Sequence, residues 1–168
     1  MDSADEFGEF VHATGARLYR AALLLTGDHF LAEDLTQATY AKVFAAWRRS
    51  RVVDNPLAYA RKTLLHVYIS HRRLRRNTEQ AINPDDLAEL SLDRDVADDS
   101  AARIDVLAAL AALSAPDRAV VVLRYWEDRS VTETALDLGI TEVAVRTRAR
   151  RALQRLRPLL EPHERTRS

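Results

Sequence analysis

The chain has 168 residues, enough for one ordinary domain or two small ones. Only four glycines and five prolines stand against 47% hydrophobic residues, which favours helices over hairpins and predicts an all-α fold. There is no cysteine, which excludes disulfides, thiolate zinc sites and thiol nucleophiles. An acidic N-terminus and a longest apolar run at 106–113 fit neither a signal peptide nor a membrane span, so we expect a cytoplasmic protein.

The charges are sorted along the chain, although 25 basic and 25 acidic side chains give a net charge of zero. Residues 37–76 hold ten basic and one acidic side chain, and residues 146–168 hold eight basic and two acidic ones. The segments 1–36, 77–100 and 101–145 are acidic in balance. Two separate basic blocks indicate contacts with a polyanion.

Helical spacing of apolar residues predicts a first helix between Phe7 and Leu25, with Thr14 the one polar residue on the stripe. Gly27 marks its end. Asp28 is the expected N-cap of a second helix that runs to about Arg49.

The pair Asn55–Pro56 places proline at the first position of a third helix. Four of its apolar residues share a face, namely Leu57, Ala60, Leu64 and Val67. We expect the three helices to bury a common core.

The third helix ends in the basic sequence SHRRLRRN at 70–77 and also carries Tyr59 and Tyr68. The arginines are suited to phosphates, and a tyrosine is suited to stacking on an exposed base. Alternatively, both tyrosines belong to the core and the arginines only stabilise the helix end through its dipole. This segment by itself favours the second interpretation.

Helical periodicity fades after this point, and we divide the chain into domains at 1–77 and 101–162. Residues 78–100 between them are predicted to be an acidic linker with a short helix at DDLAEL, 85–90.

Two capping boxes are expected in the second domain, at Ser114 with Asp117 and at Ser130 with Glu133. The core candidates between them are Val121, Val122 and either Tyr125 or Trp126.

Ala135, Gly139 and Val145 have the spacing of a helix-turn-helix, with a small residue at the crossing, glycine at the turn and an apolar anchor on the second helix. The face of that helix expected to be buried carries Val145, Ala149, Ala152, Leu153 and Leu156. The opposite face carries Val143, Thr147, Arg150, Arg151 and Gln154, with Arg146 at its margin. Such a helix suits the major groove of DNA. The alternative is a solvated arginine face, against which stands the lack of any carboxylate after Glu142 in this helix.

Three stretches resemble the extracytoplasmic-function (ECF, group 4) sigma factors of bacterial RNA polymerase, close to the actinobacterial type. AEDLTQATYAKVFAAW at 32–47 resembles the region 2 helix that docks on the β′ clamp helices. NPLAYARKTLLHVYISHRRLRR at 55–76 is similar to the part that melts and reads the −10 element. Residues 113–157 resemble region 4, which binds the −35 element and the β flap. The resemblance covers about nine-tenths of the chain and implies a region 2 bundle of three to four helices and a region 4 helix-turn-helix domain.

The resemblance also assigns functions to individual residues. For core-polymerase binding it implies Asp34, Leu35 and Gln37, although Asp34 and Gln37 by themselves read as polar residues of a solvated helix face. For −35 binding it implies Arg146, Thr147, Arg148, Arg150, Arg151 and Gln154. For −10 binding it implies Tyr59, Arg61, His66, Ser70, Arg72, Arg73, Arg75 and Arg76.

Four positions depart from the family's usual sequence. Val143 and Ala144 stand where glycine and threonine are usual, which removes a hydroxyl that could bond phosphate. His66 replaces the usual asparagine and Tyr59 the usual tryptophan. Promoter preference therefore cannot be copied from relatives. The chain ends soon after region 4, so we expect no accessory C-terminal domain.

The expected function is promoter-specific transcription initiation with core RNA polymerase, without cofactor or metal, and with an anti-sigma factor as a further partner. A one-component helix-turn-helix regulator is the alternative. An enzyme is not expected, because the five histidines are scattered and no HExxH, phosphate loop or nucleophile motif is present.

Overall fold

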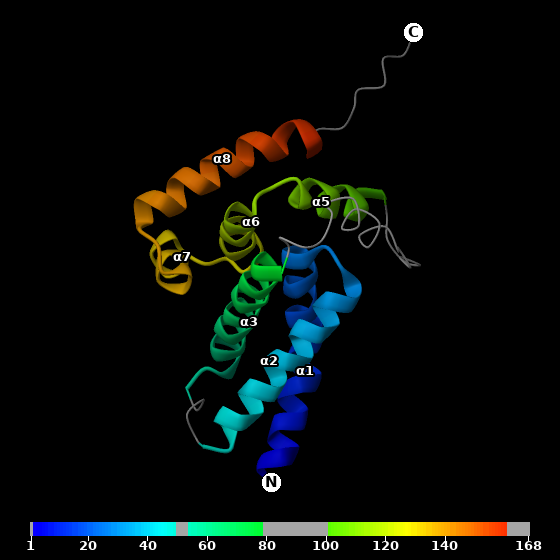
Figure 1. Ribbon diagram of the computed structural model, residues 1–168. Helices are drawn as coiled ribbons and strands as arrows, with labels where there is room; N and C mark the ends of the chain where they lie inside the picture. The colour runs from blue at the N-terminus through cyan, green and yellow to red at the C-terminus, as the bar shows by residue number, and fades with distance from the viewer. Residues whose placement is uncertain (1, 50–53, 79–100, 161–168) are drawn as a thin grey trace. The chain divides into compact units, whose positions relative to one another are not determined.

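The computed structural model describes residues 2–49, 54–78 and 101–160, and all regular elements in these ranges are helices (Figure 1). The all-α prediction is therefore confirmed for the described residues. The chain divides into two compact units, Met1–Arg94 and Asp95–Ser168. The acidic linker and its expected short helix at 85–90 lie outside the described residues.

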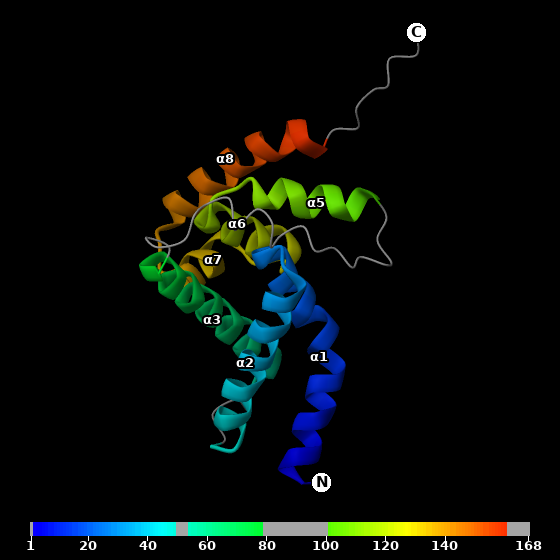
Figure 2. The same ribbon diagram turned by 45° about the vertical axis from the view of Figure 1, so that its right-hand side comes forward.

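The first unit contains α1 (Ser3–Thr26), α2 (His29–Trp47) and α3 (Pro56–Thr78). Helices α1 and α2 form an antiparallel hairpin, seen in both Figure 1 and Figure 2, and α3 packs mainly against α2. The buried side chains that join the three helices are Leu18, Ala22, Leu25, Ala32, Leu35, Val43, Ala60, Leu64, Leu65 and Tyr68. The predicted three-helix core is confirmed, although Leu57 and Val67 are only half-buried.

The turn between α1 and α2 follows its sequence signals. Gly27 has a φ of 69°, and its N–H donates to the Leu23 carbonyl at 2.7 Å. The Asp28 carboxylate accepts from the N–H groups of Phe30 and Leu31 at 2.9 and 3.2 Å. These contacts satisfy groups that a helix end leaves unpaired, so both predicted signals are confirmed.

The polar residue on the apolar stripe of α1 is also accounted for. The Thr14 hydroxyl donates to the Phe10 carbonyl at 2.7 Å, so its single proton is used there. The Tyr40 hydroxyl, 2.8 Å away, therefore donates to Thr14 and ties α2 to α1. Burial raises the pKa of Tyr40 above its ordinary value, while the hydrogen bond with Thr14 acts in the opposite direction.

The second unit contains α5 (Ala101–Ala111), α6 (Ala115–Val121), the π-helical segment η2 (Val122–Trp126), α7 (Val131–Leu138) and α8 (Glu142–Leu160). Helix α8 packs against α5, α6 and α7. Ser114 accepts from the Asp117 N–H at 3.4 Å, as expected for an N-cap. The reciprocal half of that predicted capping box is replaced, because the buried Asp117 carboxylate instead accepts from Arg148 of α8 at 3.0 Å.

The π-helical turn changes which side chains reach the core. The Glu127 N–H donates to the Val122 carbonyl five residues earlier, at 3.0 Å. Val121 and Val122 are buried as predicted, but Tyr125 and Trp126 are 53% and 44% exposed. The prediction that one of these two rings fills the core is wrong. The wider turn rotates the residues after Leu123 away from the stripe that faces the core.

Arg118, which the sequence analysis missed, closes the C-terminal end of α5. It is 8% exposed; its Nε donates to the Leu110 carbonyl at 2.8 Å, and its Nη2 donates to the carbonyls of Leu113 and Ala111 at 3.1 and 3.3 Å. One guanidinium thus satisfies carbonyls that a helix end leaves without partners.

Candidate nucleic-acid interface

Helices α7 and α8 form a helix-turn-helix. Ser130 and Glu133 complete the predicted capping box, each side chain accepting from the other residue's N–H at 3.0 Å. Gly139 ends α7 with a φ of 65°, and its N–H donates to the Ala135 carbonyl. This left-handed conformation suits glycine, because it strains residues that carry a Cβ atom.

One hydrophobic cluster holds the two helices together. Its buried members are Val120, Ala135, Val145 and Ala149, with Val131, Leu138 and Ile140 packed against them. Val145 is fully buried. Thr141 accepts from the Ala144 N–H at 3.0 Å and so caps the start of α8. The rotation of α8 about its axis is therefore set by buried contacts.

The rotation leaves a cationic face of α8 in solvent. Val145, Ala149, Ala152 and Leu156 are buried, whereas Leu153 is half-buried at their edge. The opposite face carries the five residues Val143, Thr147, Arg150, Arg151 and Gln154, and all but the half-buried Thr147 are exposed. Within the described part of the chain, Arg150 and Arg151 have no ion-pair partner. Their charge is available to an external anion.

The arginines at the two margins of this face are engaged within the unit. Arg146 lies 3.7 Å from Glu142, which also accepts from the Thr132 hydroxyl at 2.6 Å. Arg146 remains 62% exposed, so this pair is weak. On the other margin, Arg148 donates to the buried Asp117 at 3.0 Å. Arg148 therefore joins α8 to α6, and its predicted DNA contact stays a prediction that this bond does not favour.

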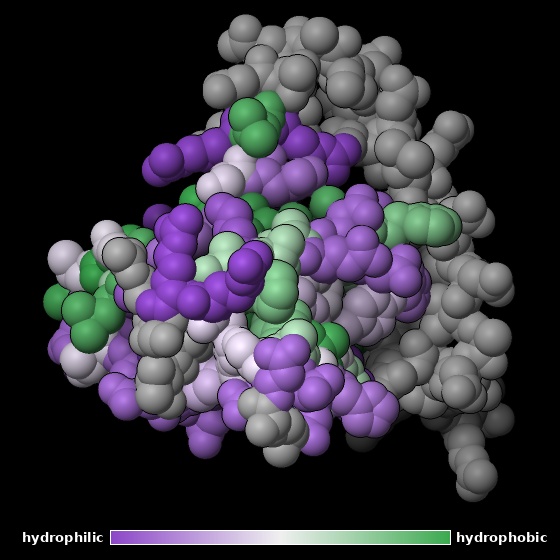
Figure 3. All heavy atoms as spheres, turned by 90° about the horizontal axis from the view of Figure 1, so that it is seen from below, coloured by the Kyte–Doolittle hydropathy of each residue, from purple (hydrophilic) through white to green (hydrophobic). Residues whose placement is uncertain are grey.

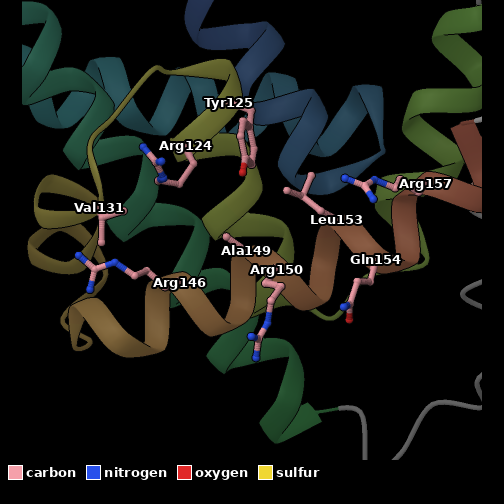
Figure 4. A pocket seen from close by; sticks show the side chains of 9 residues that line it. All are labelled: Arg124, Tyr125, Val131, Arg146, Ala149, Arg150, Leu153, Gln154 and Arg157. Carbon is pink, nitrogen blue, oxygen red and sulfur yellow. The ribbon is translucent and has the colours of Figure 1, made fainter.

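A cleft of about 370 Å³ lies beside the cationic face (Figure 4). Helix α8 supplies Arg146, Ala149, Arg150, Leu153, Gln154 and Arg157, η2 supplies Arg124 and Tyr125, and α7 supplies Val131. The lining therefore combines four arginines with an apolar floor. The sequence analysis missed this cleft, because its walls lie up to about thirty residues apart in the chain and meet only after folding.

In the first unit, one face of α3 is lined with exposed polar residues. Tyr59, His66, Ser70 and Arg73 are exposed and follow one another at intervals of seven, four and three residues, so they lie along one face. Arg72 is also exposed, but helical spacing places it on another side of α3. Tyr68 points to the opposite side and is 3% exposed. The two tyrosines therefore differ, with Tyr59 available to a ligand and Tyr68 in the core.

The remaining arginines of α3 lie nearer the bundle. Arg61 is half-buried and its Nε atom is buried, so it is not on the exposed face. Arg75 is half-buried on the side of His71. Burial, followed by Arg75 and Arg72, lowers the pKa of His71, while Asp34 of α2 acts in the opposite direction. The side chain of Arg76 lies outside the described residues.

The three residues expected to contact polymerase do not share one surface. Asp34 and Gln37 are exposed on α2. Leu35 is 4% exposed and lies in the core of the bundle. Its burial indicates that it positions α2, and its predicted polymerase contact stays a prediction that this burial does not favour.

We searched the described residues for a metal site and for a membrane-spanning helix. They contain no group of three or more His, Asp or Glu residues able to hold a metal ion. Among them, no helix is both long and apolar enough to span a bilayer. On the face seen in Figure 3, hydrophilic side chains lie between small groups of hydrophobic ones.

Comparison with known proteins gives matches over both units. Residues 10–78 match the family model for sigma-70 region 2, and residues 103–156 match that for sigma-70, region 4. The RNA polymerase sigma-E factor of Streptomyces coelicolor is 34% identical over 160 residues, which are 94% of this chain and 87% of that protein. The ECF RNA polymerase sigma factor SigL of Mycobacterium tuberculosis is 34% identical over 160 residues, covering 87% of this chain and 84% of that protein.

Two solved structures share the fold. The sigma factor RpoE of Bartonella quintana, in complex with the anti-sigma factor NepR, has a TM-score of 0.71 at 24% identity, covering 94% of this chain and 98% of that chain. CnrH, in complex with the cytosolic domain of CnrY, has a TM-score of 0.60 at 24% identity and covers 94% of this chain and 88% of that chain.

Proposed function

This chain belongs to the extracytoplasmic-function sigma factors, and we propose that it binds core RNA polymerase and starts transcription at promoters whose −35 element is read by α8. Family membership rests on the two region matches and on relatives 34% identical over most of the chain. The observation that carries the residue-level proposal is the cationic face of α8 opposite its buried stripe.

In this proposal, α8 lies in the major groove. Arg150, Arg151 and Gln154 have the donors that read guanine or adenine edges and hold phosphates, and Thr147 adds a hydroxyl. Arg146, paired only weakly with Glu142, is a phosphate contact at the margin. Arg148 holds Asp117 and positions α8, so we assign it no direct base contact.

We assign the −10 element to the exposed face of α3. Tyr59 presents a ring 38% exposed, on which an unpaired base can stack. His66 and Ser70 have hydrogen-bonding atoms on the same face, and Arg72 and Arg73 supply positive charge for the backbone. Arg61 and Arg75 are nearer the bundle and support this face from behind.

Core polymerase is the proposed partner of the exposed polar surface of α2, at Asp34 and Gln37, through the β′ clamp helices. The β flap is the proposed partner of the second unit, where the exposed Tyr125 and Trp126 offer apolar surface. We keep the proposed division into a region 2 domain at 1–77, an acidic linker at 78–100 and a region 4 domain at 101–162.

An anti-sigma factor is a further proposed partner. One structural neighbour is the sigma factor RpoE bound to the anti-sigma factor NepR, and another is CnrH bound to the cytosolic domain of CnrY. A protein that covers the cationic face of α8 would block promoter binding, because the same arginines cannot hold DNA at the same time. We further propose that the chain acts in the cytoplasm and performs no catalysis of its own, since sigma factors as a class are not enzymes.

Run-off transcription tests the proposal. Core polymerase is incubated with fragments of the source genome, with and without the full chain. Transcripts that start at defined sites only in its presence support the proposal and identify both promoter elements. If core polymerase neither binds the chain nor starts at defined sites, the proposal fails, and binding of the free chain to an operator would then favour the one-component regulator.

A further inference from the structure

Val143 is an apolar residue at the centre of a cationic surface. It lies in the first turn of α8 and is 70% exposed. Single exposed hydrophobic residues are common and need no explanation by themselves. Its position is what distinguishes it, because the polar residues that share its face are those proposed to touch DNA.

Helical spacing places Val143 in line with the proposed base-reading residues. Thr147 follows it by four residues and Gln154 follows Thr147 by seven, so the three lie along one line of the helix. This line is opposite the fully buried Val145 and Ala152. Arg150 and Arg151 lie on its two sides.

Several contacts also hold the first turn of α8 in place. Thr141 caps the helix, Val145 is buried in the hydrophobic cluster, and Glu142 is held by Thr132. Val143 is therefore presented to solvent from a turn that these contacts hold in place. In a helix-turn-helix, the N-terminal residues of the second helix are those that contact base edges.

We propose that Val143 packs against the 5-methyl group of a thymine in the −35 element and thereby determines part of the promoter preference. This inference rests on the proposed function. A valine side chain has no hydrogen-bonding atom, so it contributes nothing to a phosphate contact. The thymine methyl is the apolar feature that the major groove presents, and it matches a small aliphatic side chain.

Deoxyuridine tests the contact directly, because it differs from thymidine only in lacking that methyl group. The probe is a duplex promoter fragment identified by run-off transcription, with each thymine of the −35 element, on either strand, replaced singly by deoxyuridine. Affinity is measured for the holoenzyme formed from core polymerase and the full chain. One replacement should weaken binding about fourfold, the effect of burying one methyl group.

The same replacement should weaken binding less than about twofold in Val143→Ala, whose shorter side chain loses most of the apolar contact. Leu136→Ala is the matched control, since Leu136 is also apolar and 76% exposed but lies on α7. It should keep the full effect of deoxyuridine. Both exposed positions tolerate alanine within a helix, so folding is preserved in each variant.

The inference is overturned if no deoxyuridine weakens binding, if the loss is the same in Val143→Ala, or if the element contains no thymine. Arg150→Ala separates these results from a failure of the proposed function. If the holoenzyme binds the promoter and depends on Arg150 but not on any thymine methyl, the function stands and Val143 has no such contact. If the chain directs no defined start, the proposed function itself fails.

Discussion

Arg148 of α8 donates a hydrogen bond to the buried carboxylate of Asp117 in α6 at 3.0 Å, although 31 positions separate them. The bond ties the helix with the cationic face to the helix that supports it. It also removes one arginine from that face.

Replacing Arg148 with alanine should therefore destabilise the second unit. The change leaves the Asp117 carboxylate, 3% exposed, without its cation. We expect a loss of about 2–3 kcal/mol in unfolding free energy, below the roughly 3–5 kcal/mol of a fully buried pair, because Arg148 itself is 35% exposed. Urea unfolding followed by Trp126 fluorescence in a Trp47→Phe background measures this. Arg155→Ala, an exposed arginine on the same helix, is the control, and equal stability of the two variants would contradict the assignment.

Replacing two glycines with alanine should change the free energy of unfolding in opposite directions. Gly139 has a φ of 65° and no atom within 4 Å of an added Cβ, so Gly139→Ala suffers backbone strain without a clash. We expect this variant to lose about 1–2 kcal/mol in unfolding free energy. Gly8 lies inside α1 with equally open surroundings, and Gly8→Ala should gain about 0.5–1 kcal/mol. Thermal unfolding of both variants checks the signs; a stabilised Gly139→Ala would exclude the strained turn.

The stability of the first unit should depend on pH through His71. Its pKa is lowered chiefly by burial and then by Arg75 and Arg72, while Asp34 raises it. Between this lowered pKa and the unfolded value of about 6.5, the unfolded chain binds more protons. The unfolding free energy should therefore fall as the pH drops through that interval and change no further through His71 below it.

The variant His71→Gln isolates this contribution. Both proteins carry Trp126→Phe, and their urea unfolding is followed by Trp47 fluorescence at about pH 7.5 and about pH 5. The contributions of all other titratable groups to the pH dependence then cancel in the comparison between the two proteins. We expect a smaller decrease in the variant. Parallel decreases in both proteins would show that His71 does not carry the effect.

Gln37→Ala should weaken binding to core polymerase while the first unit stays folded, because Gln37 is exposed on α2 and is not part of the core. Binding is measured by titrating labelled chain with core polymerase. Lys42→Ala, also exposed on α2 but on another face, is the control. Unchanged affinity of Gln37→Ala would remove this residue from the proposed polymerase surface.

If Arg150 reads a base, Arg150→Ala should weaken promoter binding by about 1–3 kcal/mol and should no longer discriminate between bases at one −35 position. A uniform loss over all promoter variants, with a shallower dependence on salt, would identify a phosphate contact instead. Binding is compared on a set of single-base −35 variants. No loss on any of them would exclude α8 at this position as the reading surface.

The sequence by itself determined the features that depend on neighbours in the chain. Gly27, Asp28 and the Ser130–Glu133 pair act within one helical turn, so residue type and spacing suffice to place these helix ends. The buried stripe of α8 follows from periodicity in the same way. The assignment of roles to its individual arginines remains a prediction.

Only the tertiary structure decided which side chains remain available to a partner. Both tyrosines are amphipathic, so residue type alone does not show which of them is buried. Packing of α3 against the bundle buries Tyr68 and leaves Tyr59 in solvent. The π-helical turn exposes Tyr125. Arg148 and Arg150 are chemically identical, yet Asp117 engages one and leaves the other free for an external anion. Such differences depend on groups that approach each other only in the folded chain.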